Sequence, residues 1–198
     1  QEYGFAYLMV APSIIGLVIL NIIPFFQTIY MSFSKAAFFG EWEFAGLTNY
    51  RNMFENPEFW QATLNTLLFV LYTVPIGVIL ALIVAVLLNS EIKGKTIFRA
   101  IYFLPIVVAP AAVAMVWKWM FNTDFGIINI TLDALGLPTN NWITNPSTVL
   151  ISCAIVSIWS TVGYDAILIL SGLQAIPDVY YEAARIDGAS NIKQFFSI

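Results

Sequence analysis

Histidine is absent from this 198-residue chain, and cysteine occurs once, as Cys153. Without histidine, the chain has no Ser–His or Cys–His catalytic pair, no H-E-x-x-H zinc motif and no histidine proton relay. A single cysteine forms no disulfide within the chain, and its position in an apolar run is typical of a small buried side chain. We therefore expect no catalytic residues, no metal site and no bound cofactor.

Charged side chains are also scarce. They make up 10% of the residues, whereas hydrophobic residues make up 60%; soluble domains carry about 25% charged residues. A soluble chain of this length cannot hide so much apolar surface from water, so the composition indicates that a lipid bilayer is its solvent. The sequence has no basic run and no nucleic-acid-binding motif, and we expect no nucleic-acid partner.

Four continuous apolar stretches are long enough to cross a bilayer as helices, which takes about 20 residues each. Their approximate ranges are 7–30, 62–88, 101–121 and 149–173. Continuous apolar character argues against the strands of a membrane barrel, which alternate and need only about 10 residues. The sequence therefore predicts an all-α polytopic membrane protein.

Proline and asparagine refine these ranges. Asn56-Pro57 precedes the second stretch and Asn145-Pro146-Ser147 precedes the fourth, and each pattern predicts an N-cap followed by a first helical turn. Pro105 and Pro110 lie within the third stretch. They predict a static kink, with a gating role as the alternative.

Lysine and arginine predict the orientation in the membrane, because short cytoplasmic loops are enriched in them. Five basic residues follow the second and fourth stretches, and three lie on or near the other side. The five are Lys93, Lys95, Arg99, Arg185 and Lys193. This places the N-terminus and everything after Leu173 in the cytoplasm. The segments 34–61 and 122–145 then lie outside, where we expect them to fold onto the membrane domain or to face a partner.

The segment 176–198 follows the fourth stretch and predicts a helix, a sharp turn and a second helix. Asp178 suits the positive end of a helix dipole, Gly188 suits the left-handed conformation that ends a helix, and Ser190 can cap the next helix. On the first helix, one face carries the apolar residues Val179, Ala183 and Ile186, and another carries Glu182 and Arg185. The segment is either a connector on the membrane surface or a helix that docks onto a partner.

The same segment resembles the EAA loop of binding-protein-dependent ABC importer permeases. Glu182-Ala183-Ala184 is followed after three residues by Gly188, and after nine more by Ile198. The surrounding sequence is most similar to the carbohydrate-type branch, and the similarity extends over nearly the whole chain. It includes Arg185, Asp187, Ala189, Phe195, the run Gly46 to Tyr50, Asn65-Thr66, Phe98-Arg99, Leu104-Pro105, Trp117-Lys118-Trp119, Gly126, Asn129, Trp159, Gly163 and the run Gly172 to Pro177.

This resemblance implies the all-helical importer permease (MetI-like) core. Residues 1–198 would form a single transmembrane permease domain, truncated at the C-terminus, with the first four spans and the loop at about 176–198. It also implies a bacterial inner-membrane subunit that translocates a solute, in this branch a sugar or sugar derivative. Expected partners are a cytoplasmic ABC ATPase dimer, a second and usually different permease subunit, an extracytoplasmic solute-binding protein and the bilayer. ATP hydrolysis belongs to the ATPase, since this chain has no G-x-x-x-x-G-K-[ST] phosphate loop.

The resemblance also implies roles for residues of the loop. Glu182 would be a polar anchor to the ATPase, and Ala183 and Ala184 would allow its close approach. Gly188 would form the turn between the two helices, and Asp187 would support that turn or make a second polar contact. Ile198 would complete the coupling motif.

Four residues within the apolar stretches are candidates for a solute path: Asp165, Tyr164, Trp159 and Asn65. An acid inside a membrane is costly and indicates function by default, and aromatic rings suit stacking on a sugar. The alternative, which we favour, is packing between helices, with a hydrogen bond from Asp165 to another helix.

Other functions fit the sequence less well. A permease of the same class for amino acids, peptides or a phosphate ester is the main alternative. A secondary transporter would need inverted repeats and coupling-ion residues at the midplane, and the sequence has neither. An intramembrane enzyme lacks its catalytic groups, and a membrane scaffold leaves the EAA spacing unexplained.

Overall fold

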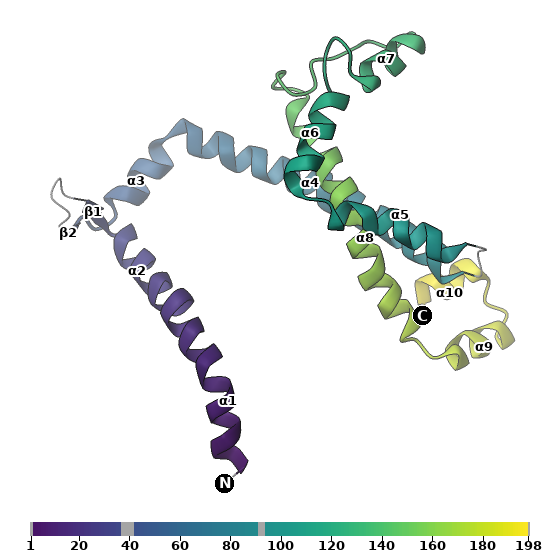
Figure 1. The fold of residues 1–198 in the computed structure, drawn as a ribbon, viewed down its shortest axis with the longest axis horizontal. Coiled ribbons are helices and arrows are strands. Elements are labelled where there is room, and N and C mark those ends of the chain that lie inside the picture. Colours follow the sequence, from purple (N-terminus) through teal and green to yellow (C-terminus); the bar gives the residue numbers. More distant parts are fainter. Residues whose placement is uncertain (1, 37–41, 91–93, 198) are drawn as a thin grey trace. The chain divides into compact units, whose positions relative to one another are not determined.

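The computed structural model describes residues 2–36, 42–90 and 94–197 of the chain. Their regular secondary structure is helical apart from one short hairpin, and turns and loops connect the helices (Figure 1). The chain separates into two units, residues 1–64 and 65–198, and the division falls within the long helix α4 (Pro57–Asn89). The predicted all-helical fold class is confirmed.

The first unit begins with an apolar helix long enough to span a membrane. The part that qualifies as a membrane span covers Gly4–Ser32, 29 residues, where the sequence predicts a span over 7–30. The helix consists of α1 (Glu2–Leu17), the π-helical turn η1 (Val18–Ile22) and α2 (Ile23–Ser32). In η1 the amide of Ile23 donates to the carbonyl of Val18, five residues earlier. The widened turn lies directly before Pro24, whose ring lacks an N–H and crowds the preceding turn.

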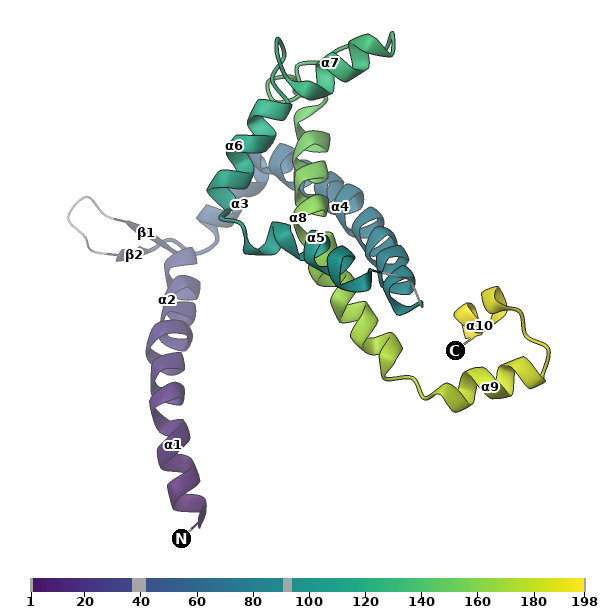
Figure 2. The same cartoon turned by 45° about the vertical axis from the view of Figure 1, so that its right-hand side comes forward.

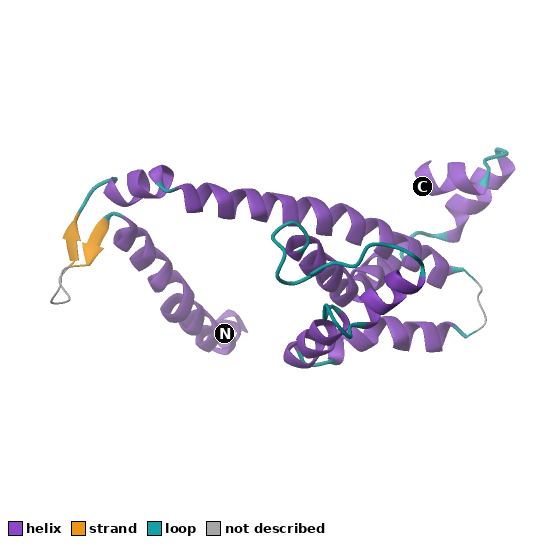
Figure 3. Cartoon of the chain, turned by 90° about the horizontal axis from the view of Figure 1, so that it is seen from above, coloured by secondary structure: helices purple, strands orange, loops and turns teal. Residues whose placement is uncertain are grey.

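A hairpin and a short helix follow α2 within the same unit. Strand β1 (Ser34–Ala36) pairs antiparallel with β2 (Trp42–Phe44), as Figure 3 shows, and α3 (Thr48–Glu55) comes next. The side-chain amide of Asn49 donates to the carbonyls of Ser32 and Ser34 at 2.9 and 2.8 Å. This part of the segment 34–61 therefore folds onto the end of α2, and the hairpin was not predicted from the sequence.

Helix α4 begins where the sequence predicts an N-cap. The amide of Glu58 donates to the Asn56 side-chain oxygen at 2.9 Å, and Pro57 is the first helical residue. The helix continues for 33 residues through Pro75 and is long and apolar enough to cross a membrane. It starts five residues before the predicted span 62–88, because the cap at Asn56 and not the apolar run sets its beginning.

The third apolar stretch forms two helices instead of one. Helices α5 (Lys95–Val107) and α6 (Pro110–Met120) are bent by 100° at the residues between them, and together they form a broken span or a re-entrant loop (Figure 2). Val108 and Ala109 are extended, with ψ of 136° and 130°. The ring of Pro110 disfavours helical backbone at the residue before it, so the helix ends there. Pro105 lies inside α5 without ending it.

The remaining helices complete the second unit. They are α7 (Ile127–Ala134), α8 (Val149–Gln174), α9 (Asp178–Ile186) and α10 (Asn191–Ser197). Helix α8 is a membrane-span candidate over almost the predicted range 149–173. The Asn145 side chain caps a turn before it, accepting from the Ser147 amide at 3.0 Å, and the helix itself starts after Thr148. The proposed cap thus acts one turn earlier than predicted.

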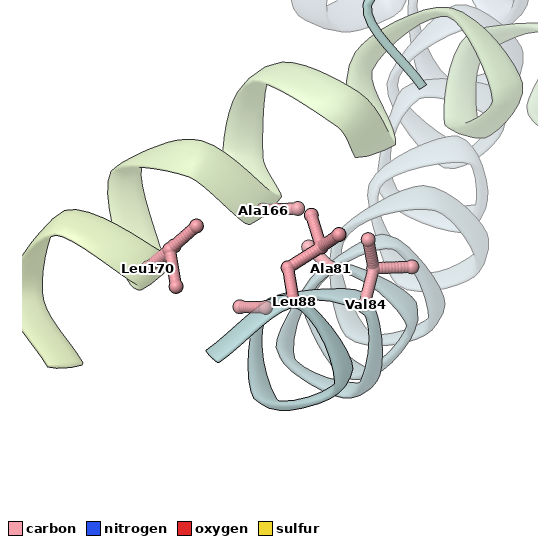
Figure 4. Packing of buried hydrophobic residues seen from close by; sticks show 6 residues of the cluster. Ala81, Val84, Leu88, Ala166 and Leu170 are labelled. Carbon is pink, nitrogen blue, oxygen red and sulfur yellow. The ribbon is translucent and has the colours of Figure 1, made fainter. Parts of the chain in front are cut away.

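The core of the second unit lies between α4 and α8. Ala81, Ala85 and Leu88 of α4 meet Ala166 and Leu170 of α8, all nearly inaccessible to solvent (Figure 4). Between apolar helices in lipid, small side chains promote association by letting the helices approach closely. Most other large apolar side chains of the described residues are exposed, as expected for surfaces that face lipid or other subunits.

Helix α5 contacts α8 at Gly163. A Cβ atom built on Gly163 would overlap the backbone carbonyl of Tyr102, whereas one built on Gly172 of the same helix would have nothing within 4 Å. The α5–α8 contact therefore requires a residue without a side chain at position 163.

We predict that Gly163→Ala destabilises the protein and that Gly172→Ala does not. Both changes add one methyl group and raise helix propensity by about 1 kcal/mol. Only the first forces α5 away from α8, at a cost of about 1–3 kcal/mol for overpacking. Thermal unfolding of the purified protein in detergent measures both. An equal melting temperature for the two variants would show that the α5–α8 contact is not as close as described.

Candidate functional site

The segment after α8 forms the predicted helix, turn and helix. Only Ala175, Ile176 and Pro177 separate α8 from α9. Pro177 is extended, with ψ of 138°, and directly precedes Asp178, whose carboxylate lies in the first turn of α9. A carboxylate at this end of a helix is favoured by the helix dipole. The short connection means that α9 follows the end of α8 closely.

A Schellman motif ends α9. Gly188 has a φ of 73°, the left-handed conformation that the sequence analysis assigned to it. The Ala189 amide donates to the carbonyl of Ala184 at 2.9 Å, and the Gly188 amide donates to that of Arg185 at 3.1 Å. These bonds satisfy carbonyls that a helix end would otherwise leave without partners. Gly188 therefore turns the chain sharply, and Asp187 lies at the C-cap beside it.

The second short helix, α10, is held to this turn by two polar side chains. The Ser190 hydroxyl accepts a hydrogen bond from the Lys193 amide at 3.3 Å, as expected for an N-cap. The side-chain amide of Gln194 donates to the carbonyl of Ala189 at 2.8 Å, and Gln194 is buried. Gln194 was not predicted as a bonding residue, because no periodic pattern marks a glutamine side chain that bonds a backbone carbonyl five residues earlier. Ile198, the last residue of the resemblance, lies outside the described residues.

The two faces of α9 differ in exposure. The apolar face, Val179, Ala183 and Ile186, is open to its surroundings, with Ile186 87% exposed and Val179 61% exposed. Glu182 is also exposed. Tyr181 and Ala184 are partly buried on the other side. Ala183 is therefore available for contact, and the partly buried Ala184 accepts the Ala189 amide at its carbonyl in the turn that ends α9.

A groove, here called the α9 groove, lies between α9 and the end of α4. A hollow of about 450 Å³ is lined by Asn89 of α4 and by Asp178, Tyr181, Glu182 and Arg185 of α9. An adjoining hollow of about 570 Å³ shares Asn89, Tyr181 and Arg185 and reaches Gln194 and Phe195 of α10. Among the described residues, the salt bridge joins Arg51 to Glu55. Glu182 and Arg185 therefore form no ion pair with each other in this groove. The carboxylate of Glu182 is thus available to a partner.

The structure does not gather the four solute-path candidates into one site. Trp159 of α8 packs edge to face against Trp117 of α6, with ring centroids 5.6 Å apart. Tyr164 and Asp165 follow five and six residues later on α8, roughly 140° and 240° further around the helix. Asp165 is partly buried and forms no hydrogen bond to other described residues, so the interhelical bond that we favoured is not made within this part of the chain. Asn65 is an exposed residue of α4.

At the other end of α8, Asn129 organises the segment 122–148. Its amide nitrogen donates to the carbonyls of Thr123 and Asn140, at 3.0 and 2.9 Å. Its oxygen accepts from the Asn140 amide at 3.2 Å and from the Trp142 indole at 2.8 Å. Asn129 is 4% exposed, and each of its hydrogen-bonding atoms has a partner. From the sequence, Asn129 stood out only as part of the family resemblance. Its position between Ile128 and Ile130 was the available sign that it is buried.

Aromatic rings connect this segment to α8. Trp142 lies 5.8 Å from Phe121, Phe121 lies 5.4 Å from Trp117, and Trp117 lies 5.6 Å from Trp159, measured between ring centroids. Trp117 is therefore a packing residue. Trp119 is 52% exposed, and exposed tryptophans are enriched where a membrane protein meets the interface between lipid and water.

A helical core of membrane-span candidates, followed by an exposed helix–turn–helix, is the architecture of a multi-pass membrane subunit. Residues 44–198 match the family model of the binding-protein-dependent transport system inner membrane component. The chain belongs to this family, which confirms the resemblance. It is therefore a multi-pass inner-membrane permease component and not itself an enzyme.

Relatives agree with this family assignment, and a solved structure agrees with the fold. The chain is 37% identical over 197 residues to the probable ABC transporter permease protein YurN of Bacillus subtilis, covering 97% of this chain and 67% of the relative. It is 36% identical to the trehalose/maltose transport system permease protein MalF of Thermococcus litoralis, covering 100% of this chain and 68% of the relative. The chain has the same fold as a chain in the crystal structure of a bacterial ABC transporter involved in the import of the acidic polysaccharide alginate. The TM-score is 0.84 at 23% sequence identity, and the match covers 100% of this chain and 67% of that chain. The chain thus spans about two thirds of the length of these proteins.

We predict that Asn129→Ala loosens the segment 122–148. The change removes all four hydrogen bonds of a buried side chain, and each polar group left without a partner costs about 1–3 kcal/mol. Faster limited proteolysis within 122–148 and a lower melting temperature are the expected results.

Thr131→Ala is the matched control on the same helix. The exposed Thr131 hydroxyl donates only to the carbonyl of Ile127 within α7. If the two variants are cleaved at the same rate, Asn129 does not hold the segment together.

Proposed function

We propose that this permease imports a sugar or sugar derivative and that the segment Asp178–Ser197 docks onto a cytoplasmic ABC ATPase. The observation that carries the docking proposal is the face of α9 that remains uncovered. Val179, Ala183 and Ile186 form an exposed apolar strip beside the carboxylate of Glu182. Such a strip on a short helix suits insertion into an apolar groove of a partner protein.

The residues of the segment take distinct roles in this proposal. Glu182 anchors the helix to a basic group of the ATPase, and Ala183 allows the partner backbone to approach closely. Gly188 adopts the φ of 73° that the turn requires. Asp187 supports that turn or adds a polar contact. Ala184, which accepts the Ala189 amide, stabilises the turn and contributes less to the surface. Ile198 remains part of the proposed coupling motif by resemblance.

Coupling to transport follows from how closely α9 is joined to α8. Three residues connect them, and α8 packs against both α4 and α5. We propose that ATP closes the ATPase dimer, that α9 moves with it, and that α8 transmits this movement to the membrane core. A loaded extracytoplasmic binding protein then releases its solute into a path formed with a second permease subunit, which we propose to be a different chain.

The solute class rests on the carbohydrate-type pattern of the sequence and on the relative that is named as a trehalose/maltose permease. Trp159 and Tyr164, with Asp165 and Asn65, remain proposed contributors to the solute path, where aromatic rings would stack on a sugar. A solute of another class is the alternative, followed by secondary transport.

We also propose that residues 1–198 belong to a single transmembrane domain whose N-terminus is cytoplasmic. The distribution of lysine and arginine supports this orientation. It places α9 and α10 on the side of the ATPase, and α7 on the side of the binding protein.

We predict that Glu182→Gln and Ile186→Glu each weaken retention of the ATPase. Loss of a charged anchor in a protein interface costs about 2–5 kcal/mol, and a glutamate in the apolar strip must be desolvated on docking. Co-purification of the ATPase with the tagged full-length permease measures the effect. Asp133→Asn, which removes an exposed carboxylate from α7, is the matched control. If both variants insert in the membrane and retain the ATPase as the control does, α9 is not the docking helix.

The orientation is tested separately with single cysteines in a Cys153→Ala background. Gly4, Thr139 and Lys193 are each exposed and suit replacement by cysteine. In intact cells, a membrane-impermeant maleimide should label only Thr139→Cys, and in inside-out vesicles it should label Gly4→Cys and Lys193→Cys. Labelling of Gly4→Cys in intact cells would place the N-terminus outside.

A further inference from the structure

A second groove, here called the outer groove, lies between α6 and α8 beside the segment 122–148. It has a volume of about 420 Å³, within the range of about 300–1,000 Å³ that small-molecule sites occupy. Figures 1 and 2 show α6 and α8 side by side in this region. Its lining is Ala114, Trp117, Lys118, Phe121, Ile143, Val149, Ser152, Cys153, Val156 and Ser157.

The wall of this groove is almost entirely apolar and is held in shape by its neighbours. Trp117 and Phe121 form one side, and their rings are packed against each other and against Trp159 and Trp142. The Ser152 hydroxyl lies 2.9 and 3.0 Å from the carbonyls of Trp142 and Thr148 and is already engaged. A sugar needs several polar groups for its hydroxyls, so this lining suits a hydrocarbon chain instead.

One positive charge lies at the groove. Lys118 is in the last turn of α6 and is the only basic residue between Arg99 and Arg185. It forms no ion pair with the described residues. Its place in the last turn is favourable for the helix dipole, but that interaction leaves the ammonium group free to bind an anion. Exposed Trp119 beside it is typical of the depth at which lipid headgroups lie.

We propose that the outer groove binds an anionic phospholipid, with one acyl chain along Trp117 and Phe121 and the phosphate at the Lys118 ammonium. The combination of an apolar channel and a single cation at the membrane interface matches the two parts of such a lipid. Basic residues near a membrane surface attract anionic headgroups in the same way. This inference goes beyond the proposed transport function and does not depend on ATPase docking.

Cys153, the single cysteine of the chain, lines the groove and is exposed, so it reports occupancy directly. The test uses the full-length permease complex, delipidated in detergent, with phosphatidylglycerol or phosphatidylcholine of the same acyl chains added back. The rate at which N-ethylmaleimide modifies Cys153 is followed by mass spectrometry of this chain. Phosphatidylglycerol should protect at about fivefold lower concentration than phosphatidylcholine, which corresponds to about 1 kcal/mol for one basic residue at a membrane surface.

Charge variants make the test specific. Lys118→Gln should abolish the difference between the two lipids, and Lys118→Arg should keep it. Lys95→Gln removes a partly buried charge from the start of α5, outside the lining of the groove, and should also keep it. Equal protection by the two lipids in the native protein overturns the proposal, as does a preference that survives in Lys118→Gln. A Cys153 that is unreactive without lipid shows that protein covers the groove and overturns it too. None of these readouts involves the ATPase, so failure here is distinguishable from failure of the docking proposal.

Discussion

The close packing of α8 against its neighbours is the contact on which the second unit depends. Gly163 lies directly beneath the Tyr102 carbonyl of α5, and Ala166 meets Ala81 and Ala85 of α4. Apolar side chains gain little by leaving lipid for one another, so helices in a bilayer associate through close van der Waals contact and need small residues where they meet. Without these residues, α4, α5 and α8 would have no specific arrangement.

Helix α8 also joins the two functional regions of this unit. Its last residue lies three positions before α9, so the proposed docking strip is carried by the end of a packed membrane helix. Near its first residues, the column of Trp142, Phe121, Trp117 and Trp159 connects α8 to the segment that Asn129 organises. The proposed coupling between partners on the two sides of the membrane needs such a rigid connection, because a flexible one would absorb the movement of either partner.

Local features were predictable because their causes are local. The cap at Asn56, the left-handed turn at Gly188 and the cap at Ser190 each involve residues within a few positions of one another, and the structure shows all three. The bend between α5 and α6 was predicted as a kink, but not as a turn of 100°. The central role of Asn129 and the bond from Gln194 were missed, since their partners lie 5 to 13 residues away in irregular chain. No periodic pattern marks such partners.

The sequence by itself determined that this is a multi-pass membrane protein, where its apolar helices run, and to which family of permeases it belongs. Transfer of apolar residues into lipid depends on composition and length, and turn chemistry depends on adjacent residues, so both can be read along the chain. Only the tertiary structure decided that Val179, Ala183 and Ile186 stay exposed while Ala184 is partly buried, and that α6 and α8 line an apolar groove with Lys118 beside it. Which face of a helix is covered depends on the distant helices that pack against it, and their approach is set by contacts such as that of Gly163 with Tyr102.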